Sequence, residues 1–211
     1  MKTTATLALT LLTLLCLSSP SFGQNEGYSI GDEAMDFELT NVDGSRVSLS
    51  GMENAKGAFV IFSCNTCPYV KAYEDRMIQL HEKYAPQGYP VIAINPNDAQ
   101  ISPGDSFDAM KKRAEEKDFP FPYLHDETQE VIKAYGGSRT PHVYLLNKEN
   151  GKFIVKYIGA IDNNYQDASA VTKHYAEDAV ASLLKGQNIA EETTKAIGCS
   201  IKWTRKSVSV R

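Results

Sequence analysis

Short continuous apolar runs in this chain alternate with longer stretches in which apolar positions recur every three or four residues. Residues 58–62 (AFVIF) and 91–94 (VIAI) are continuous apolar runs, too short for helices and rich in β-branched and aromatic side chains, which predicts strands buried on both faces. Between them, apolar residues recur at helical spacing from Val70 to Tyr84 and stop before Gly88, which predicts an amphipathic helix. The order strand, helix, strand predicts a βαβ unit.

The segments around this unit predict further strands and a helical insertion. Residues 36–49 alternate between apolar and polar positions around turn residues at 41–44, which predicts a small hairpin that covers a sheet edge. Residues 95–104 are expected to form a loop, and a short helix is expected to begin near Asp105. A brief extended segment should follow at residues 121–124.

The second half of the chain shows a helix signature and a hairpin signature. Asp126, with Gln129 three residues later, matches a capping box at the start of a small helix that residues 136–137, both glycine, would close. Residues 143–146 and 153–158 are apolar runs separated by turn residues, which predicts a hairpin.

The last helix and the fold class complete this prediction. Apolar residues recur at helical spacing over residues 168–184 and the pattern stops at Gly186, so a helix is expected there, with a C-terminal tail from about residue 187. No repeat or linker divides residues 24–211, which predicts one domain. The expected fold class is α/β, with a mixed central sheet flanked by helices, an N-terminal hairpin and a helical insertion.

Residues 1–23 have the composition of a secretory signal peptide. Lys2 precedes an apolar stretch over residues 5–17, and residues 21–23 (SFG) form a small-x-small cleavage site. A membrane-spanning helix needs about 20 apolar residues, and this stretch is shorter. Cys16 follows a leucine where a lipoprotein signal has a small residue, so we assign it to the apolar stretch. We expect an exported protein, periplasmic or secreted, without a membrane span after cleavage.

Composition excludes one class of partner. The 211-residue chain is 42% hydrophobic and 23% charged, which is typical of a globular domain long enough to bury a core without a metal or disulfide framework. Its formal net charge is -4 and its pI about 5.6, which removes the electrostatic basis for binding nucleic acid or an anionic membrane surface. We expect no nucleic-acid partner.

The sequence Cys64-Asn65-Thr66-Cys67 lies where the buried strand at residues 58–62 ends and the first helix begins. In an exported protein with a βαβ unit, such a CxxC is expected to be a redox-active dithiol. Unpaired N–H groups and the helix dipole at a helix start stabilise a thiolate. We therefore expect Cys64 to be the nucleophile and Cys67, one turn further along, to be the resolving thiol. Pro68 follows at once, in a position where proline loses no intrahelical hydrogen bond.

Two other interpretations of the CxxC and two of Cys199 stay open. A structural disulfide more often joins distant segments, and a zinc site would need a second pair of ligands that Cys199 alone cannot provide. Cys199 itself lies in the tail near Trp203. It is either a buried, inert thiol packed by Trp203 or an additional resolving thiol that relays a disulfide from Cys64 and Cys67.

Arg139-Thr140-Pro141-His142 leads into the strand predicted at residues 143–146, so the proline marks a strand start or a cis turn. The order strand, CxxC, helix, then Thr-Pro before a second half resembles the thioredoxin fold, in which a cis-proline lies beside the CxxC. In that fold the residue before the proline offers backbone hydrogen bonds to a bound substrate chain. The resemblance implies that Thr140 and Pro141 shape the substrate-binding groove. We also expect Arg139 to lower the pKa of the nucleophilic thiol.

Four longer segments resemble the peroxiredoxin-like redoxins that carry a CxxC, the AhpC/TSA-like family. These segments are Phe62–Lys71, Ile94–Asp98, Phe121–Gln129 and Gly198–Trp203. Together they span almost the whole chain after the signal peptide.

This sequence lacks residues that peroxidases of this family and thioredoxin use for their activities. A peroxidase of this kind needs Pro-x-x-x-Thr/Ser-x-x-Cys, but Ile61 and Gly57 occupy the two key positions before Cys64, and Cys64 and Val60 occupy those before Cys67. A thiol peroxidase is therefore an alternative function, which peroxide consumption would reveal. Thioredoxin also has a buried acid in the strand where this chain has Ala58, and a tryptophan before the CxxC that is absent here.

His142 suggests a second alternative, because it follows Pro141 and is expected near the dithiol. Thiolate and imidazole ligands suit copper. Sco-type copper chaperones are thioredoxin-fold proteins of this kind, although they carry CxxxC, so a copper-delivery protein is the competing class. His81, His125 and His174 are expected to be surface or packing residues.

We therefore predict an exported thiol–disulfide oxidoreductase. Its substrates would be protein dithiols or disulfides, and a redox partner protein would exchange electrons with it. We expect neither a cofactor nor a metal. The direction of electron flow does not follow from Asn65 and Thr66, which separate the two cysteines. The family resemblance and the signal peptide together favour a bacterial periplasm.

Overall fold

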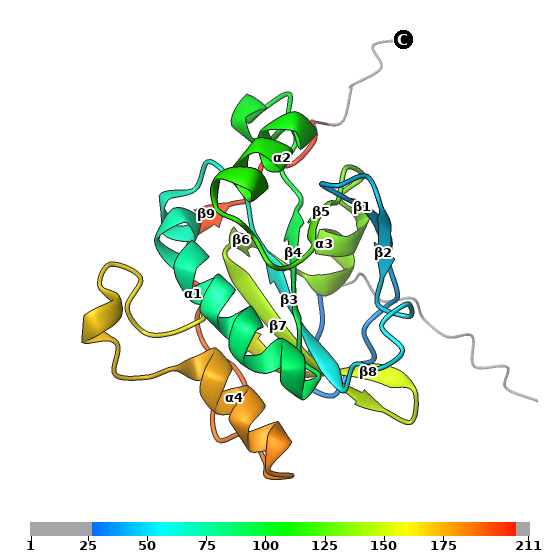
Figure 1. The fold of residues 1–211 in the computed structure, drawn as a ribbon, viewed down its shortest axis with the longest axis vertical. Coiled ribbons are helices and arrows are strands. Elements are labelled where there is room, and N and C mark those ends of the chain that lie inside the picture. The colour runs from blue at the N-terminus through cyan, green and yellow to red at the C-terminus, as the bar shows by residue number, and fades with distance from the viewer. Residues whose placement is uncertain (1–26, 206–211) are drawn as a thin grey trace, which may run out of the picture.

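A mixed β-sheet forms the centre of the protein (Figure 1). The computed structural model describes residues 27–205, so the predicted signal peptide at residues 1–23 lies outside the described residues. The strands are β1 (Glu38–Asn41), β2 (Arg46–Ser48), β3 (Gly57–Phe62), β4 (Val91–Asn95), β5 (Tyr123–His125), β6 (Arg139–Thr140), β7 (His142–Glu149), β8 (Lys152–Gly159) and β9 (Cys199–Ser200). The helices are α1 (Pro68–Tyr84), α2 (Phe107–Glu116), α3 (Glu130–Tyr135) and α4 (Tyr175–Leu184), with 3₁₀ turns at Ala85–Gln87, Pro103–Asp105 and Ala168–Ala170.

Seven strands pair in the order β2-β1-β5-β4-β3-β7-β8, and β6 and β9 form a separate two-stranded sheet. The predicted βαβ unit is confirmed, because β3 and β4 run parallel, with Phe59 opposite Val91 and Phe62 opposite Ile94. On its other side β3 pairs antiparallel with β7. Every residue of β3 and β4 is buried, as the continuous apolar runs predicted.

The two faces of the sheet are covered by different helices. Helix α1 places Tyr73, Met77 and Leu80 against Phe59 and Ile61 of β3, and α4 packs on the same side. Helix α3 covers the opposite face, where the alternate residues of β3 are buried, and apolar residues of the edge hairpin β1–β2 pack into the same core. Within residues 27–205, no helix combines the length and apolar composition that crossing a membrane requires.

The N-terminal hairpin β1–β2 is confirmed, and the segment after the helical insertion contributes more than the sequence indicated. We expected residues 121–124 to be merely extended. In the structure β5 pairs parallel with β4 and antiparallel with β1, so it joins the hairpin to the central sheet. The sheet is therefore mixed, and the expected α/β fold class is confirmed.

The capping box predicted at Asp126 and Gln129 is wrong, because α3 begins at Glu130 and its N-cap residue is Gln129, which makes no side-chain cap bond. The Asp126 carboxylate still accepts hydrogen bonds from the backbone N–H groups of Val131 and Ile132, in the first turn of the helix. The Gln129 side chain does not return to Asp126. Its amide nitrogen donates to the carbonyl oxygens of Pro96 and Lys202, so it holds the C-terminal tail instead.

The last helix begins at Tyr175 rather than Ala168, so the predicted helix over residues 168–184 was wrong in its first part. Residues 168–170 form a 3₁₀ turn that the Asp167 side chain caps. The Asn163 side chain accepts hydrogen bonds from the backbone N–H groups of Thr172 and Lys173. These local bonds hold the segment extended, because they use donors that a helix would need.

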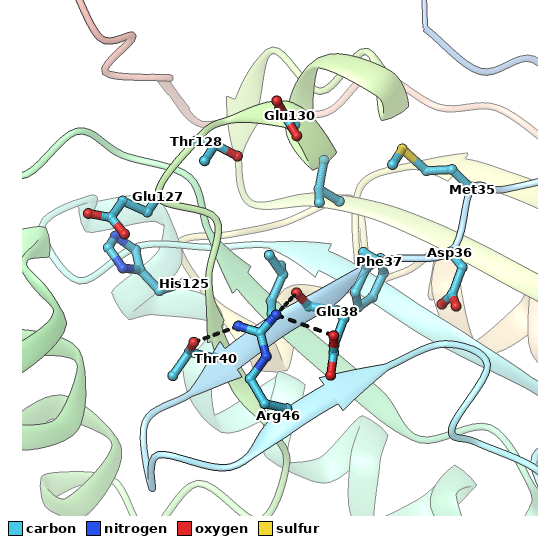
Figure 2. Close-up of a pocket in the computed structure, with 12 residues that line it drawn as sticks. Met35, Asp36, Phe37, Glu38, Thr40, Arg46, His125, Glu127, Thr128 and Glu130 are labelled. Atoms are coloured by element: carbon cyan, nitrogen blue, oxygen red, sulfur yellow. Dashed lines mark hydrogen bonds and ion pairs between the residues drawn. The ribbon is translucent and has the colours of Figure 1, made fainter.

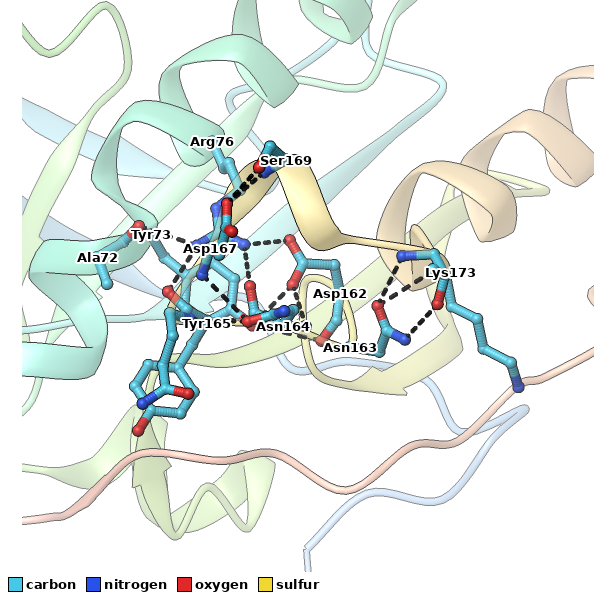
Figure 3. A network of polar contacts seen from close by, with 12 residues as sticks. Ala72, Tyr73, Arg76, Asp162, Asn163, Asn164, Tyr165, Asp167, Ser169 and Lys173 are labelled. Carbon is cyan, nitrogen blue, oxygen red and sulfur yellow. Dashed lines mark hydrogen bonds and ion pairs between the residues drawn. The ribbon is translucent and has the colours of Figure 1, made fainter.

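A buried ion pair attaches the loop after β8 to helix α1 (Figure 3). The Arg76 guanidinium donates to the Asp162 carboxylate at 2.6 Å and to the carbonyl oxygens of Asn164 and Tyr165. The Asp162 side chain is only 3% exposed, and the Tyr73 hydroxyl also donates to it at 3.0 Å. This network fixes α1, the helix that follows the CxxC, against the second half of the chain.

An exposed arginine on the hairpin offers a contrast (Figure 2). Arg46 donates to the Thr40 hydroxyl and the Glu38 carbonyl. These residues lie at a pocket of about 380 Å³, and Cys64, Cys67 and Cys199 are not among the residues that line it. Its ion pair with the Glu38 carboxylate spans 3.6 Å between side chains that are both more than half exposed.

We expect Arg76→Ala to lower the free energy of unfolding by about 3 kcal/mol, because it leaves the buried Asp162 charge without its cation. Arg46→Ala is the matched control and should cost no more than about 1 kcal/mol, as is usual for exposed pairs. Urea unfolding followed by circular dichroism measures both. Equal losses in the two variants would contradict the structural role assigned to the network.

Candidate active site

The CxxC occupies the junction between β3 and α1. The Ser63 N–H donates to the Ile94 carbonyl, so β3 stays attached to β4 until one residue before Cys64. Helix α1 begins at Pro68, which makes Cys67 its N-cap residue. Both cysteine side chains are buried, each with 2% exposure. The predicted location, at the end of a buried strand and the start of a helix, is therefore observed.

A buried carboxylate, Asp105, fixes the backbone between the two cysteines. One of its oxygens accepts hydrogen bonds from the N–H groups of Asn65 and Thr66, at 2.7 and 3.1 Å. The other accepts from the hydroxyls of Thr66 and Ser102 and from the Asn97 amide. The sequence predicts Asp105 only as the start of a helix. No sequence pattern marks it as a neighbour of the CxxC, because the contact depends on the folded chain. Thioredoxin has its buried acid in the strand, at the position of Ala58. In this protein the buried acid near the CxxC is Asp105, which comes from the 3₁₀ turn Pro103–Asp105.

Thr140 lies beside both cysteines. Its Oγ1 is 3.1 Å from the Cys64 sulfur, and its carbonyl oxygen is 3.2 Å from the Cys67 sulfur. The Thr140–Pro141 peptide bond is cis, which decides between the two alternatives that the sequence left open. Arg139 does not contact either thiol in the manner we expected, because its guanidinium donates to the Gly198 carbonyl.

The third cysteine joins this site through the tail. Strand β9 pairs antiparallel with β6, with Cys199 opposite Thr140 and Ser200 opposite Arg139. The sulfurs of Cys67 and Cys199 are 2.6 Å apart, in hydrogen-bonding contact. All three thiols are free, and Cys199 is the least buried of them. Cys199 is therefore partly exposed and in contact with the dithiol, and its redox role stays a prediction.

The contacts between the three thiols favour ionisation of Cys67 over that of Cys64 and Cys199. A hydrogen bond from the Cys64 thiol, with further ones from the Cys199 thiol and the Val70 N–H, lowers the pKa of Cys67 to about 5. The same contact with Cys67, followed by burial and the Asp105 charge, raises the pKa of Cys64. Burial and the bond to Cys67 raise the pKa of Cys199 to about 11.

This distribution differs from the expectation that the helix start stabilises a thiolate on Cys64. Cys67, not Cys64, is the N-cap of α1 and is therefore nearest to the positive end of the helix dipole. Cys67 also lies between two thiol donors, whereas the negative charge of Asp105 acts on Cys64. Because the thiols are hydrogen-bonded to one another, they titrate as a coupled unit, and the contacts around Cys67 lower the pKa of the first step.

His142 is placed at the start of β7, with a buried ring that packs on Tyr144 at 4.8 Å between centroids. Burial lowers its pKa to about 4, so the imidazole is neutral at physiological pH. Among the described residues its Nδ1 has no hydrogen-bond partner. Within residues 27–205, no three His, Cys, Asp or Glu side chains are grouped in a metal-binding arrangement.

Comparison with known proteins assigns the family. Residues 30–162 match the AhpC/TSA family. This chain belongs to that family. It is 30% identical over 138 residues to a thiol-disulfide oxidoreductase ResA from Bacillus cereus, a match that covers 65% of this chain and 75% of the relative. The predicted family and the predicted oxidoreductase class are therefore confirmed.

Solved structures confirm the thioredoxin-like fold. An uncharacterized conserved protein from Geobacillus kaustophilus superposes with a TM-score of 0.78 at 39% identity, over 85% of this chain and 94% of that one. A hypothetical protein from Sinorhizobium meliloti gives the same TM-score at 32% identity, over 85% and 97%. A lipoprotein thioredoxin from Streptococcus pneumoniae, at 21% identity and a TM-score of 0.53 over 72% and 99%, shares the fold alone.

We expect the fully reduced protein to form its first thiolate near pH 5, because the donors around Cys67 favour the charged form. Ultraviolet absorbance of the thiolate, recorded against pH, measures this. Cys67→Ala should abolish that step, and Cys199→Ala should move it to higher pH by removing one donor. A first thiolate at the ordinary value of about 8.5 would contradict the assignment.

Asp105→Asn should lower the pKa of Cys64, because it removes a negative charge that disfavours the Cys64 thiolate. The titration is made in a Cys67→Ala, Cys199→Ala background, so that the signal belongs to Cys64 alone. Asp108→Asn, on the exposed first turn of α2, is the control and should leave that pKa unchanged. An unchanged pKa in both variants would show that Asp105 does not act on the thiol.

Proposed function

We propose that this protein is an exported thiol–disulfide oxidoreductase that exchanges disulfide bonds with protein partners through Cys64 and Cys67. The observation that supports these two residues is their convergence at the β3–α1 junction, beside Thr140 and the cis bond to Pro141. Export rests on the signal peptide expected at residues 1–23. The oxidoreductase class itself comes from the relatives.

In the reducing direction the exchange takes two steps. The Cys64 thiol passes its proton to the Cys67 thiolate to which it is hydrogen-bonded, and the Cys64 thiolate attacks one sulfur of the partner's disulfide. The partner's other sulfur leaves as a thiolate and takes up a proton. Cys67 then loses its proton and attacks the Cys64 sulfur, which forms the Cys64–Cys67 disulfide and releases the partner as a dithiol. The same steps in reverse oxidise a partner.

The low pKa of Cys67 suits the first step. In the reduced protein Cys67 is a thiolate at neutral pH, so it can accept the proton that Cys64 releases when it attacks. In the reverse direction the same property makes Cys67 a good leaving group. Cys64 is kept protonated by its surroundings until Cys67 accepts its proton, which limits side reactions of the attacking thiol.

Partner docking is proposed along Thr140 and Pro141. We place the partner cysteine beside Thr140, whose hydroxyl contacts the Cys64 sulfur. Strand β6 is short, and its pairing with β9 is the contact that an incoming chain would have to share or replace. One round of exchange oxidises the Cys64–Cys67 dithiol when a partner is reduced, and reduces the disulfide when a partner is oxidised. A second protein that supplies or removes electrons must therefore restore the starting state.

We expect both Cys64→Ser and Cys67→Ser to abolish catalysed reduction of a model protein disulfide such as insulin. Only Cys67→Ser should accumulate a mixed disulfide with the substrate, because attack by Cys64 proceeds while its resolution fails. Ser169→Ala, on the exposed 3₁₀ turn after β8, is the control and should retain the wild-type rate. Exchange that persists in both cysteine variants would refute the proposal.

A further inference from the structure

Cys199 is a third thiol within the site that two-cysteine exchange does not use. Cys64 and Cys67 are each 2% exposed, whereas Cys199 is partly exposed. The Cys67 sulfur contacts both neighbouring thiols, since it lies 2.6 Å from the Cys199 sulfur and accepts a hydrogen bond from Cys64. The cluster is therefore a chain of three sulfurs, with Cys67 in the middle and its most accessible member at one end.

Hydrogen bonds attach the tail to the rest of the fold both before and after Cys199. Upstream of it, the Thr194 hydroxyl accepts a hydrogen bond from the Ala160 N–H. Downstream, the Lys202 N–H donates to the Asn97 side chain, and its carbonyl oxygen accepts from the Gln129 amide. Ile201 between them is buried in the core formed by the hairpin and α3. The contact between Cys67 and Cys199 is thus built into the fold.

Gly198 allows this strand to approach β6. A side chain at this position would place its Cβ 2.1 Å from the Thr140 carbonyl oxygen and 2.6 Å from the Thr140 carbonyl carbon. Only glycine fits there without displacing the backbone. The residue immediately before Cys199 is therefore the one that permits the thiol to reach the dithiol.

We propose that Cys199 is a redox-active thiol that exchanges with Cys67 and presents the disulfide to a protein partner. This proposal rests on the proposed function. In the internal step the Cys199 thiolate attacks the Cys67 sulfur of the Cys64–Cys67 disulfide. The Cys67–Cys199 bond forms, the Cys64–Cys67 bond breaks, and Cys64 leaves as a thiolate. Cys199 loses one proton and Cys64 gains one, so no external oxidant or reductant takes part.

The external step occurs at the accessible end of the chain. A partner thiolate attacks the Cys199 sulfur, and Cys67 leaves as the thiolate that its surroundings stabilise, which favours cleavage of this bond. A second partner thiol then attacks the mixed disulfide and releases Cys199 as a thiol. The partner leaves as a disulfide and all three cysteines end reduced. A partner disulfide is reduced by the same steps in reverse.

Peptide mapping of the oxidised protein tests this step directly. Trypsin cleavage after Lys56 and Lys71 leaves Cys64 and Cys67 in one peptide, and cleavage after Lys195 and Lys202 leaves Cys199 in another. The reduced protein, without residues 1–23, is treated with one equivalent of diamide, quenched in acid, alkylated and digested. A disulfide between the two peptides then reports transfer to Cys199.

We expect this cross-link in the wild type alongside the Cys64–Cys67 disulfide, and as the main product in Cys64→Ser. Two variants are matched controls. Gly198→Ala keeps all three cysteines but displaces β9, and Cys199→Ser with Ser200→Cys moves the thiol to the opposite side of the strand. Both should form the cross-link about a hundredfold more slowly, because misplacement of reacting groups by about 1 Å has this effect.

The outcomes separate this inference from the function on which it rests. If Cys199 stays alkylated in the wild type and in Cys64→Ser while the Cys64–Cys67 disulfide forms normally in the wild type, the inference is overturned and the two-cysteine exchange stands. If the wild type forms neither disulfide, both fail. Equal cross-linking rates in wild type and the two control variants would also overturn it, since the geometry of β9 would then be irrelevant.

Discussion

Thr140 is the residue on which the arrangement of this site depends, because it contacts all three cysteines. Its hydroxyl lies against Cys64, its carbonyl oxygen against Cys67, and its backbone is paired with Cys199. The sheet register explains why. Phe62, the last residue of β3, is opposite His142, the first residue of β7, in an antiparallel pair. The chain that leaves β3 must therefore pass the chain that enters β7, which places the CxxC beside Thr140.

The charge distribution follows from the same construction. The helix after the CxxC begins at Pro68, so the end of its dipole is next to Cys67. The loop before it needs its free N–H groups satisfied, and Asp105 does this with a buried carboxylate that also disfavours a charge on Cys64. Packing and electrostatics thus act together, so that one thiol is charged and ready while its neighbour is protonated. Such a pair suits a reaction in which the two sulfurs take different roles.

Much of this could be predicted from the sequence. The continuous apolar runs identified β3 and β4 correctly because burial on both faces leaves no polar position, and the CxxC and Thr140-Pro141 were recognised because each has a local signature. The contribution of Asp105 was not predictable, since it depends on a loop from another strand reaching the CxxC. The start of α4 was missed for a related reason, because the Asn163 side chain competes for the N–H groups of an otherwise helical pattern.

The C-terminal tail shows the same limit at longer range. The sequence is compatible with either an inert or a redox-active Cys199, because nothing local indicates how far a tail lies from a loop more than a hundred residues earlier. The Gln129 side chain illustrates the point, since it matches a capping box yet binds the backbone of Lys202 and thereby helps to hold the tail. Contacts of this kind appear only when the whole chain is folded.

The most direct test of the central claim, that Cys64 and Cys67 form a working redox couple, is the midpoint potential of the protein in glutathione buffers. The fraction of protein with an intramolecular disulfide is measured by acid quenching and thiol alkylation. We expect a reversible two-electron transition within the range of known exchange proteins, roughly −120 to −300 mV. A protein whose thiols stay reduced, or stay oxidised, across that whole range would contradict it.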